Sequence, residues 1–343
     1  MTRRAVLICP GRGTYNKAEL GYLARHHGDK PDLLARFDAI RTAEGQETVT
    51  ELDGAARFQT AKHTRGDIAS PLIYASSFAD AQALAEDIEI IAVTGNSMGW
   101  YIALAAGGAL SAEDGFRVVN TMGRLMQEAS IGGQLVYPVV GETWQPDPAR
   151  KSDLMALVAE INARENHTLA LSIDLGGMLV LAGDEPGLSA FEAAAPKDAT
   201  RAPLRLPNHA AFHTGMQTPV AERGRRLLSP EMFGQPKTPL IDGRGAIWWP
   251  YATDPAELWD YTLGHQVIEP YDFTRAVTVA AREFAPDLFI VTGPGTTLGG
   301  AVAQSLIACD WRGLASKADF QTRQAQNPFL IAMGREDQRK LVV

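Results

Sequence analysis

The sequence predicts an α/β protein in which a parallel sheet is covered by helices. Three apolar runs that stop at glycine-containing turns carry this prediction, and they occupy residues 5–9, 88–93 and 288–291. Continuous apolar runs of this length suit strands that are buried on both faces, as the strands of a parallel sheet are. Helical patterns at residues 32–41 and 77–86 lie between the strands and supply the covering layer.

A second unit is predicted at residues 133–207, where the pattern of the sequence changes. The segment reads as strand, helix, two strands, helix and strand, at residues 134–140, 152–163, 169–174, 178–182, 187–195 and 202–206. The order βαββαβ is that of a ferredoxin-like unit. A chain of 343 residues is long enough for about two domains. We therefore expect a body formed by residues 1–132 and 208–343, with a ferredoxin-like subdomain inserted at residues 133–207.

The composition argues against several classes of partner. A net charge of −8, from 32 Lys and Arg against 40 Asp and Glu, does not supply the basic face that nucleic-acid binding requires. The two cysteines, Cys9 and Cys309, lack the spacing of a disulfide framework or a metal site. No apolar run approaches the ~18 residues of a membrane span, and the N-terminal apolar stretch is too short for a signal peptide. We expect a cytoplasmic monomer with no metal, membrane or nucleic-acid partner.

A pentapeptide of the form G-x-S-x-G, Gly95-Asn96-Ser97-Met98-Gly99, follows the second predicted strand and precedes a helical stretch. In this setting the glycines permit a strained strand-to-helix turn that exposes the serine hydroxyl at a helix N-terminus. Ser97 is therefore a candidate nucleophile. The alternative is an incidental Gly/Ser turn, because such pentapeptides also occur by chance.

A serine nucleophile needs a nearby base, and the chain has seven histidines. Two of them, His209 and His213, lie just after the predicted insertion, where the chain returns to the body. Sequence spacing alone does not choose between these two. Surface or loop positions are expected for His26, His27, His63 and His167.

Five short motifs occur in order along the chain. They are the Pro10-Gly11-Arg12-Gly13 turn, the Gly95–Gly99 pentapeptide, Ala211-Phe212-His213-Thr214 with Pro219 six residues after the histidine, Gln266 four residues before Pro270 with Phe273-Thr274 after it, and Gly293-Pro294-Gly295. Together they resemble the malonyl-CoA:acyl carrier protein transacylases and the acyltransferase domains of polyketide synthases. The resemblance covers nearly the whole chain and implies an α/β-hydrolase-like body with a ferredoxin-like insertion.

The resemblance also implies roles for individual residues. Ser97 would accept the acyl group, and His213 would be its general base, because the family's histidine stands in this A-F-H-[ST] setting. His209 would be a neighbour that shapes the pocket. A backbone carbonyl near Ile268 and Glu269 would orient the histidine, or the Glu269 side chain would contact the imidazole directly.

Two backbone amides would stabilise the negative charge that develops on the carbonyl oxygen during acyl transfer. One belongs to Met98, which follows the nucleophile, and the other belongs to Arg12, where the family usually has glutamine. The Arg12 side chain itself is interpreted as a solvated charge. The implied reaction is ping-pong transfer from an acyl-CoA to an acyl carrier protein, with coenzyme A thioester as a substrate and no further cofactor.

The sequence departs from the resemblance at the place of the arginine that pairs with the malonyl carboxylate. Met122 stands there, two residues before Arg124, and a thioether cannot bind a carboxylate as a guanidinium does. A pocket of this kind should prefer an uncharged acyl chain, unless the helix slips so that Arg124 takes the role. Two further changes accompany it, Asn96 for a histidine and Ser70 for a glutamine. We expect the acyl pocket to contain Met122, Asn96, Ser70, His209 and Phe212.

Three functions remain open at this point. The first is a carrier-protein acyltransferase, either for a monocarboxylic acyl group or for malonyl with a rebuilt carboxylate clamp. The second is an acyl-carrier hydrolase, in which water resolves the acyl-serine, and the third is a non-catalytic protein that docks a carrier. Five arginines and one acid, Glu222, lie between Arg201 and Arg226. Because acyl carrier proteins are acidic, Arg225 and Arg226 are the expected docking residues, with a solvated helix face as the alternative.

Overall fold

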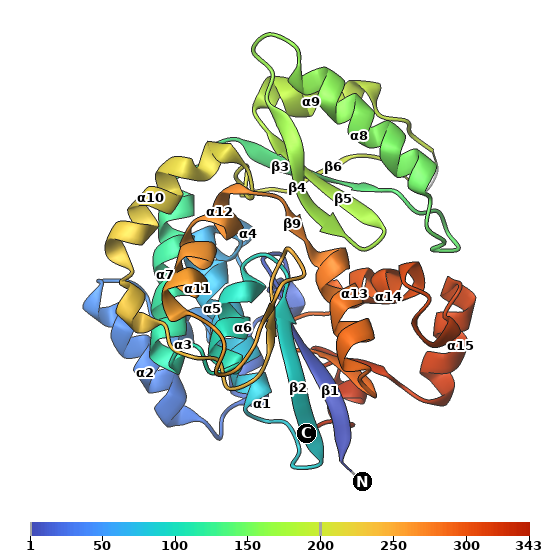
Figure 1. Ribbon diagram of the computed structural model, residues 1–343. Coiled ribbons are helices and arrows are strands. Elements are labelled where there is room, and N and C mark those ends of the chain that lie inside the picture. The colour runs from blue at the N-terminus through green and yellow to red at the C-terminus, as the bar shows by residue number, and fades with distance from the viewer. Residues whose placement is uncertain (1, 199–200) are drawn as a thin grey trace.

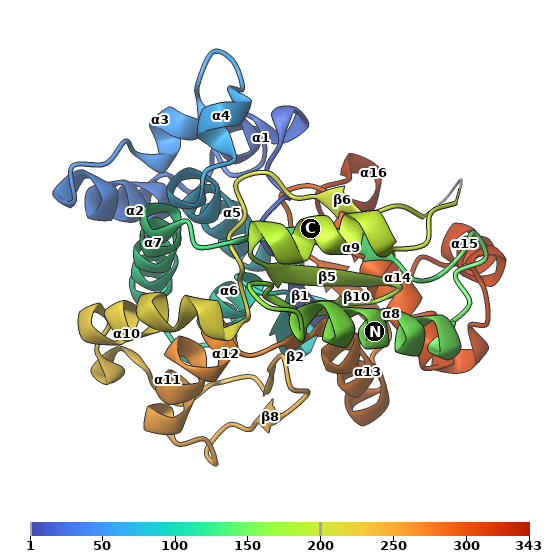
Figure 2. The same cartoon turned by 90° about the horizontal axis from the view of Figure 1, so that it is seen from above.

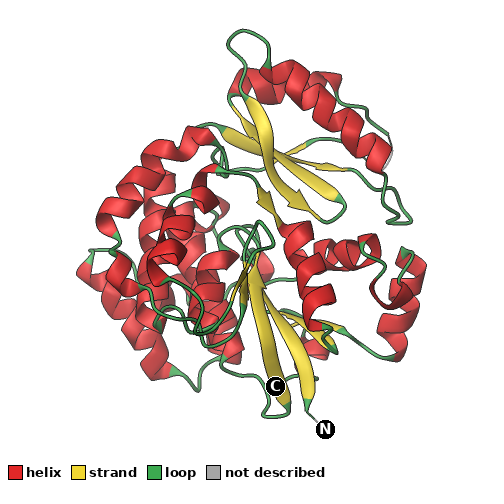
Figure 3. Ribbon diagram, viewed as in Figure 1, coloured by secondary structure: helices red, strands yellow, loops and turns green. Residues whose placement is uncertain are grey.

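The computed structural model describes residues 2–198 and 201–343. The body contains a six-stranded sheet in the order β11-β10-β1-β2-β7-β8, in which every neighbouring pair is parallel except β7 and β8 (Figures 1 and 3). Its strands are β1 (Arg3–Cys9), β2 (Ile88–Gly95), β7 (Leu240–Ile241), β8 (Ile247–Trp248), β10 (Leu288–Val291) and β11 (Leu330–Ala332). The three apolar runs form the adjacent strands β10, β1 and β2, so the predicted α/β fold with a parallel sheet is confirmed.

Helices cover both faces of this sheet (Figure 1). The helices of the first part of the body are α1 (Tyr22–His26), α2 (Pro31–Ala43), α3 (Val49–Asp53), α4 (Thr60–His63), α5 (Gly66–Ala81), α6 (Gly99–Ala106) and α7 (Ala112–Ala129). Those of the second part are α10 (Thr218–Leu227), α11 (Pro255–Leu263), α12 (His265–Ile268), α13 (Phe273–Phe284), α14 (Leu298–Ala308), α15 (Lys317–Gln326) and α16 (Glu336–Arg339).

The helix predicted at residues 77–86 is misplaced. The observed helix, α5, begins at Gly66 and ends at Ala81, with Pro71 inside it. A proline ordinarily marks the first turn of a helix or interrupts its interior. In addition, nearly every residue of α5 is buried, so it has no polar face from which its length could be recognised.

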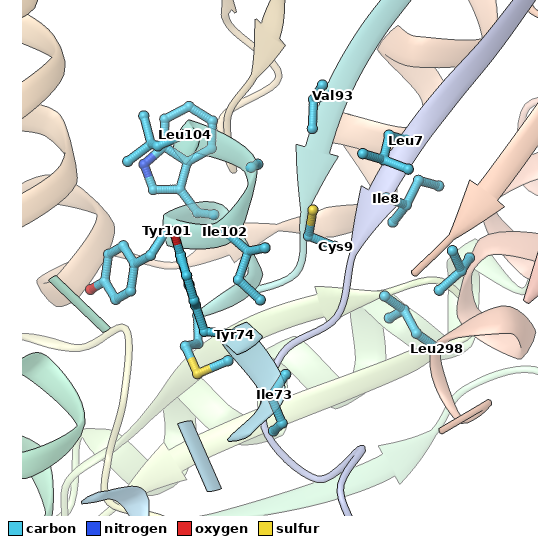
Figure 4. Close-up of a cluster of buried hydrophobic side chains, with 14 of the residues drawn as sticks. Leu7, Ile8, Cys9, Ile73, Tyr74, Val93, Tyr101, Ile102, Leu104 and Leu298 are labelled. Atoms are coloured by element: carbon cyan, nitrogen blue, oxygen red, sulfur yellow. The ribbon is translucent and has the colours of Figure 1, made fainter. Parts of the chain in front are cut away.

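The core of the body lies where β1 and β2 meet the helices. Figure 4 shows Leu7 and Ile8 of β1 beside Val93 of β2, with Ile102 of α6 and Ile73 of α5 among the side chains nearby. All five are at most 2% exposed. Because the central strands are covered on both faces, they contain continuous apolar residues instead of the alternating pattern of a half-exposed sheet.

The inserted segment forms a second sheet, in the order β6-β3-β5-β4-β9. Its elements are β3 (Gly133–Pro138), α8 (Pro148–Asn162), β4 (Leu169–Leu175), β5 (Met178–Gly183), α9 (Glu185–Ala194) and β6 (Leu204–Arg205). The first four strands pair antiparallel, and α8 and α9 cover the face turned away from the body (Figures 1 and 2). The fifth strand, β9 (Tyr271–Asp272), comes from the second part of the body and pairs parallel with β4, so the sheet extends past the expected boundary at residue 207.

No helix in the described part of the chain is long and apolar enough to cross a membrane.

Candidate active site

Ser97 lies in a tight turn between β2 and α6. Its φ of 56° is in the left-handed region, which is strained for a residue with a side chain. A Cβ on Gly95 would lie 2.2 Å from the carbonyl carbon of Gly99, and a Cβ on Gly99 would lie 2.2 Å from the carbonyl oxygen of Cys9. Only glycine fits at these two positions. The pentapeptide therefore forms the expected strand-to-helix turn, with Ser97 at the N-terminal end of α6.

His213 is the histidine that meets Ser97. Its Nε2 lies 2.7 Å from Ser97 Oγ, and its Nδ1 lies 2.6 Å from the carbonyl oxygen of Gln266. Because a carbonyl can only accept, Nδ1 carries the proton in the neutral ring and Nε2 is free to accept the serine proton. His209 points elsewhere, with its Nδ1 2.8 Å from Oε1 of Gln134. The histidine at Ser97 is thus His213, as the family resemblance implied, and not His209, which sequence spacing alone did not distinguish from it.

The expected orienting group at Ile268 or Glu269 is wrong, because the carbonyl that contacts His213 belongs to Gln266. Glu269 is exposed and does not approach the imidazole. In a regular helix the carbonyl of Gln266 would accept from the amide four residues on, but that residue is Pro270, which has no N–H. Because α12 ends at Ile268, Glu269 is extended and Pro270 has no N–H, the helix supplies no donor to this carbonyl, which is available to His213.

The side chain of Gln266 connects the two halves of the site. Its Nε2 donates to the carbonyl oxygen of Ser97 at 3.1 Å, and its Oε1 accepts from the Tyr101 hydroxyl at 3.0 Å. Tyr271 adds a second tie, since its hydroxyl donates to the carbonyl oxygen of Gly95 at 2.5 Å. Gln266 belongs to one of the five sequence motifs, but its place in the site was not predicted. Its spacing of four residues from a proline was the available signal.

Burial lowers the pKa of His213 to about 4, because the charged imidazolium loses its hydration. The ring is therefore neutral at pH 7, which is the state that can accept a proton. A buried serine–histidine pair of this kind can activate a hydroxyl for attack on an acyl group.

Two backbone amides next to Ser97 are free to bind an oxyanion. Within the described residues, neither the amide of Arg12 nor that of Met98 donates a hydrogen bond. The Pro10–Gly13 turn lies directly against the Ser97 turn, since a Cβ on Gly11 would stand 2.6 Å from the carbonyl oxygen of Asn96. Both expected donors therefore come from segments that border the Ser97 hydroxyl.

A cavity of about 30 Å³ opens beside Ser97. Three of the five expected pocket residues line it, namely Met122, Ser70 and Phe212. The other two do not, because Asn96 is buried behind the turn and His209 lines a neighbouring, more polar cavity of about 170 Å³. The remaining lining residues are Arg12, Ser97, Met98, Tyr101, Val119, Gly123, Met126, His213, Gln266 and Val267.

Met122, and not Arg124, faces the cavity. Met122 is 1% exposed, and its sulfur packs against Gly224 of α10. Arg124 lies on another side of α7 and forms an ion pair with Glu128 at 3.0 Å. The helix runs without a break from Ala112 to Ala129, so a slip that would bring Arg124 into the pocket does not occur.

The side chain of Arg12 is not the solvated charge that the sequence suggested. Its Nη2 donates to the carbonyl oxygens of Thr64, at 2.9 Å, and Asn208, at 2.8 Å. Its guanidinium carbon lies 5.5 Å from the centre of the Phe212 ring. Arg12 lines both the cavity at Ser97 and the polar cavity beside it. Nothing in the sequence around residue 12 indicated this position, because the contacts come from segments that are distant along the chain.

The arginines expected to dock a carrier are less available than the sequence suggested. Arg225 forms an ion pair with Asp260 and lies 4.6 Å above the Trp259 ring, while Arg223 pairs with Glu128 at 2.9 Å. Arg226, at the end of α10, is exposed. The local excess of positive charge is therefore partly neutralised.

In the described part of the chain, no cluster of His, Cys, Asp and Glu side chains could hold a metal ion.

No protein-family model matches the chain. Among curated proteins, the chain is 27% identical over 211 residues to the malonyl CoA-acyl carrier protein transacylase of Salmonella typhimurium, which is 61% of this chain and 63% of that protein. It is 25% identical over 315 residues to a phenolphthiocerol/phthiocerol polyketide synthase of Mycobacterium tuberculosis, which is 87% of this chain and 18% of that protein. The matched part is thus less than two thirds of the length of these relatives.

Solved structures share the fold over almost the whole chain. An acyl carrier protein S-malonyltransferase from Vibrio cholerae superposes with a TM-score of 0.75 at 17% identity, covering 99% of both chains. The acyltransferase domain from the second module of the salinomycin polyketide synthase superposes with a TM-score of 0.70 at 20% identity, covering 98% of this chain and 70% of the other. The resemblance inferred from the motifs is confirmed: the chain is similar in sequence to malonyl-CoA:acyl carrier protein transacylases and shares the fold of the solved ones.

Proposed function

We propose that this protein is an acyltransferase that moves an acyl group from coenzyme A to the phosphopantetheine thiol of an acyl carrier protein. The single observation that carries this proposal is the chain of contacts from Ser97 Oγ through His213 to the carbonyl of Gln266. The names of the relatives supply the reaction class, since they include a carrier-protein transacylase and a polyketide synthase.

In the first half-reaction, Ser97 Oγ attacks the thioester carbonyl. The Oγ–carbon bond forms, the carbon–sulfur bond breaks, and the serine proton passes through Nε2 of His213 to the departing thiolate. The amides of Arg12 and Met98 hold the oxyanion that forms between these events. Because Nδ1 donates to Gln266, the imidazolium that forms transiently keeps a hydrogen-bonded partner on its other nitrogen.

In the second half-reaction, the carrier thiol replaces coenzyme A. His213 takes the thiol proton, the sulfur–carbon bond forms, the Oγ–carbon bond breaks, and the proton returns to Ser97. Hydrolysis is the same step with water as the attacking group. The competition between a thiol and water therefore decides whether the protein is a transferase or an editing hydrolase.

The acyl cavity of this protein lacks the arginine that, by the family resemblance, would hold a malonyl carboxylate from the position of Met122 on α7. In this chain that wall of the cavity carries Met122, Met126 and Val119, which are all apolar. A carboxylate placed against them would lose its hydration without gaining a partner, which costs several kcal/mol. An uncharged acyl group is compatible with this apolar wall. A dicarboxylic acyl group is also compatible if its free carboxylate binds elsewhere in the cavity.

The test is intact-mass analysis after incubation with acetyl-, propionyl- and malonyl-CoA, followed by addition of holo acyl carrier protein. A mass increase on Ser97 that then moves to the carrier supports transfer. An adduct that is lost as free acid at the same rate with or without carrier replaces the proposal with a hydrolase. If no thioester gives an adduct, the protein does not form an acyl-serine, and the non-catalytic, carrier-docking function is the one that remains.

The matched control compares two serine substitutions. Ser97→Ala should abolish the adduct, whereas Ser152→Ala, at an exposed position of α8, should leave it unchanged. An adduct that persists in the Ser97 variant would contradict the assignment of the nucleophile.

A further inference from the structure

Arg12 brings a positive charge to a cavity whose other lining residues are uncharged, given the neutral ring of His213. Among the residues that the structure describes, it is the only lysine or arginine that lines the cavity at Ser97. It lies on the Pro10–Gly13 turn, whereas Met122 contributes from α7. The family resemblance implies an arginine at the position of Met122 on α7. In this protein the cation at the cavity comes instead from the Pro10–Gly13 turn.

The guanidinium is held in position by uncharged groups. Its hydrogen bonds in the described part of the chain go to the carbonyl oxygens of Thr64 and Asn208, and its Nε is buried without a hydrogen-bond partner. The Phe212 ring limits its movement on another side. Because the guanidinium is already held in one position, binding an anion would cost little further side-chain conformational entropy.

No carboxylate among residues 2–198 and 201–343 neutralises this charge. Asp67 is the carboxylate that acts on it electrostatically, but both oxygens of Asp67 accept from Arg65, at 3.0 and 2.9 Å. Burial lowers the pKa of the Arg12 guanidinium to about 10, which still leaves it charged at pH 7. A partly buried cation without a counter-ion is a ready site for an anion, since an anion can restore the interactions that the guanidinium lost with water.

We propose that Arg12 binds the free carboxylate of a dicarboxylic acyl group on Ser97, and so replaces the cation that is missing from α7. This inference rests on the proposed acyltransferase function and deepens it, since it selects the rebuilt carboxylate clamp over an uncharged acyl chain. Arg12 then has two roles that come from different atoms: the backbone amide serves the oxyanion, and the side chain serves specificity.

The length of the substrate indicates that Arg12 would bind a carboxylate of the acyl group and not a phosphate of coenzyme A. The cavity that Arg12 shares with Ser97 lies directly beside the nucleophile. The phosphates of coenzyme A are separated from the thioester by the whole pantetheine arm. They remain outside this cavity when the thioester carbonyl meets Ser97.

The test compares acylation of Ser97 by malonyl-CoA and acetyl-CoA, with the ratio of the two kcat/KM values as the readout. The wild-type protein should favour malonyl-CoA. Arg12→Gln should lower the ratio by about tenfold or more, and Arg12→Lys should give an intermediate ratio, because lysine keeps the charge but not the bidentate geometry. The control is Arg124→Gln, which removes an arginine from the outer side of α7 and should leave the ratio unchanged.

A charge-relocation variant gives an independent check. Arg12→Gln combined with Met122→Arg moves the cation from the turn to α7 and should recover at least part of the malonyl preference. A wild-type protein that favours acetyl-CoA, or a ratio that does not respond to Arg12→Gln, overturns the inference while leaving the acyltransferase intact. Absence of any adduct on Ser97 instead overturns the proposed function, so the two failures are distinguishable. The ratio measured for the wild-type protein tests the inference even if the variants do not fold.

Discussion

The carbonyl oxygen of Gln266 lies 2.6 Å from Nδ1 of His213 and meets no competing donor four residues on, where Pro270 has no amide hydrogen. The same Gln266 donates from its side chain to the carbonyl of Ser97. One residue therefore orients the base and supports the turn that presents the nucleophile. A backbone carbonyl does here what a carboxylate does in other serine–histidine sites.

Pro270→Ala should slow acylation of Ser97 several-fold, up to about tenfold. Alanine permits α12 to extend beyond Ile268, and in the extended helix its amide would compete with His213 for the Gln266 carbonyl. The rate of the acylation burst measures the effect. Pro255→Ala is the control, because Pro255 occupies the first position of α11, where an amide is unpaired in any case. Equal rates in the two variants would mean that the proline has no part in orienting the histidine.

Gly99→Ala should destabilise the protein by more than about 3 kcal/mol and remove the acyl adduct, because the new Cβ would stand 2.2 Å from the carbonyl oxygen of Cys9. Gly299→Ala, in α14, is the matched control. A Cβ there meets no atom within 4 Å, so this variant should be neutral or more stable by roughly 0.5–1 kcal/mol. Urea unfolding measures both changes. A stable Gly99 variant would show that the turn can relax.

Acidification should destabilise the protein between about pH 6.5 and pH 4. Burial lowers the pKa of His213 to about 4 and that of His209 to about 3, so the unfolded chain binds more protons in this window than the folded chain does. Stability therefore rises with pH up to about 6.5 and is lost below it. From pH 6.5 or above to pH 5, His213 alone contributes roughly 2 kcal/mol. Unfolding free energies measured across this range give the slope.

The variant His209→Gln provides the corresponding check on the pH dependence. It removes one of the histidines whose pKa is lowered by burial and should flatten the slope below pH 6.5, while His213 contributes to the slope that remains, together with other shifted groups such as His26 and His265. A slope that is the same in both proteins would show that His209 is not held neutral by burial.

Arg226→Glu should reduce the rate of acyl transfer to the carrier several-fold at low ionic strength and have little effect on acylation by coenzyme A thioesters. Arg226 is exposed, whereas its neighbour Arg225 is engaged by Asp260 and Trp259, so reversal of Arg225 would also disturb α11. Added salt should diminish the difference between variant and wild type, since the attraction to an acidic carrier is screened.

Charge reversal at Arg57, an exposed arginine between α3 and α4, is the control for Arg226. It changes the net charge by the same amount on another part of the surface. If both reversals slow carrier transfer equally, the effect comes from net charge and α10 is not a docking surface.

Much of the fold was accessible from the sequence because its signals are local. The runs at β1, β2 and β10 are mostly apolar, with Glu89 inside the β2 run, because the central parts of these strands are covered on both faces, and this pattern identified them without any partner. The strands and helices of the insertion also appear in the predicted order, because their sequence patterns are local as well. By contrast, α5 was misplaced, because a fully buried helix with an internal proline shows neither a polar face nor a clear start.

The sequence by itself determined that Ser97 occupies a strand-to-helix turn, because Gly95 and Gly99 impose that geometry locally. The choice of His213 followed only from a family resemblance, and the tertiary structure decided its contact with Ser97, the carbonyl that orients it, and the surroundings of the acyl pocket. These depend on distances between segments more than 50 residues apart, such as 2.6 Å from His213 to Gln266 and 2.8 Å from Arg12 to Asn208. Such distances follow from how the sheet and helices pack, which no local pattern encodes.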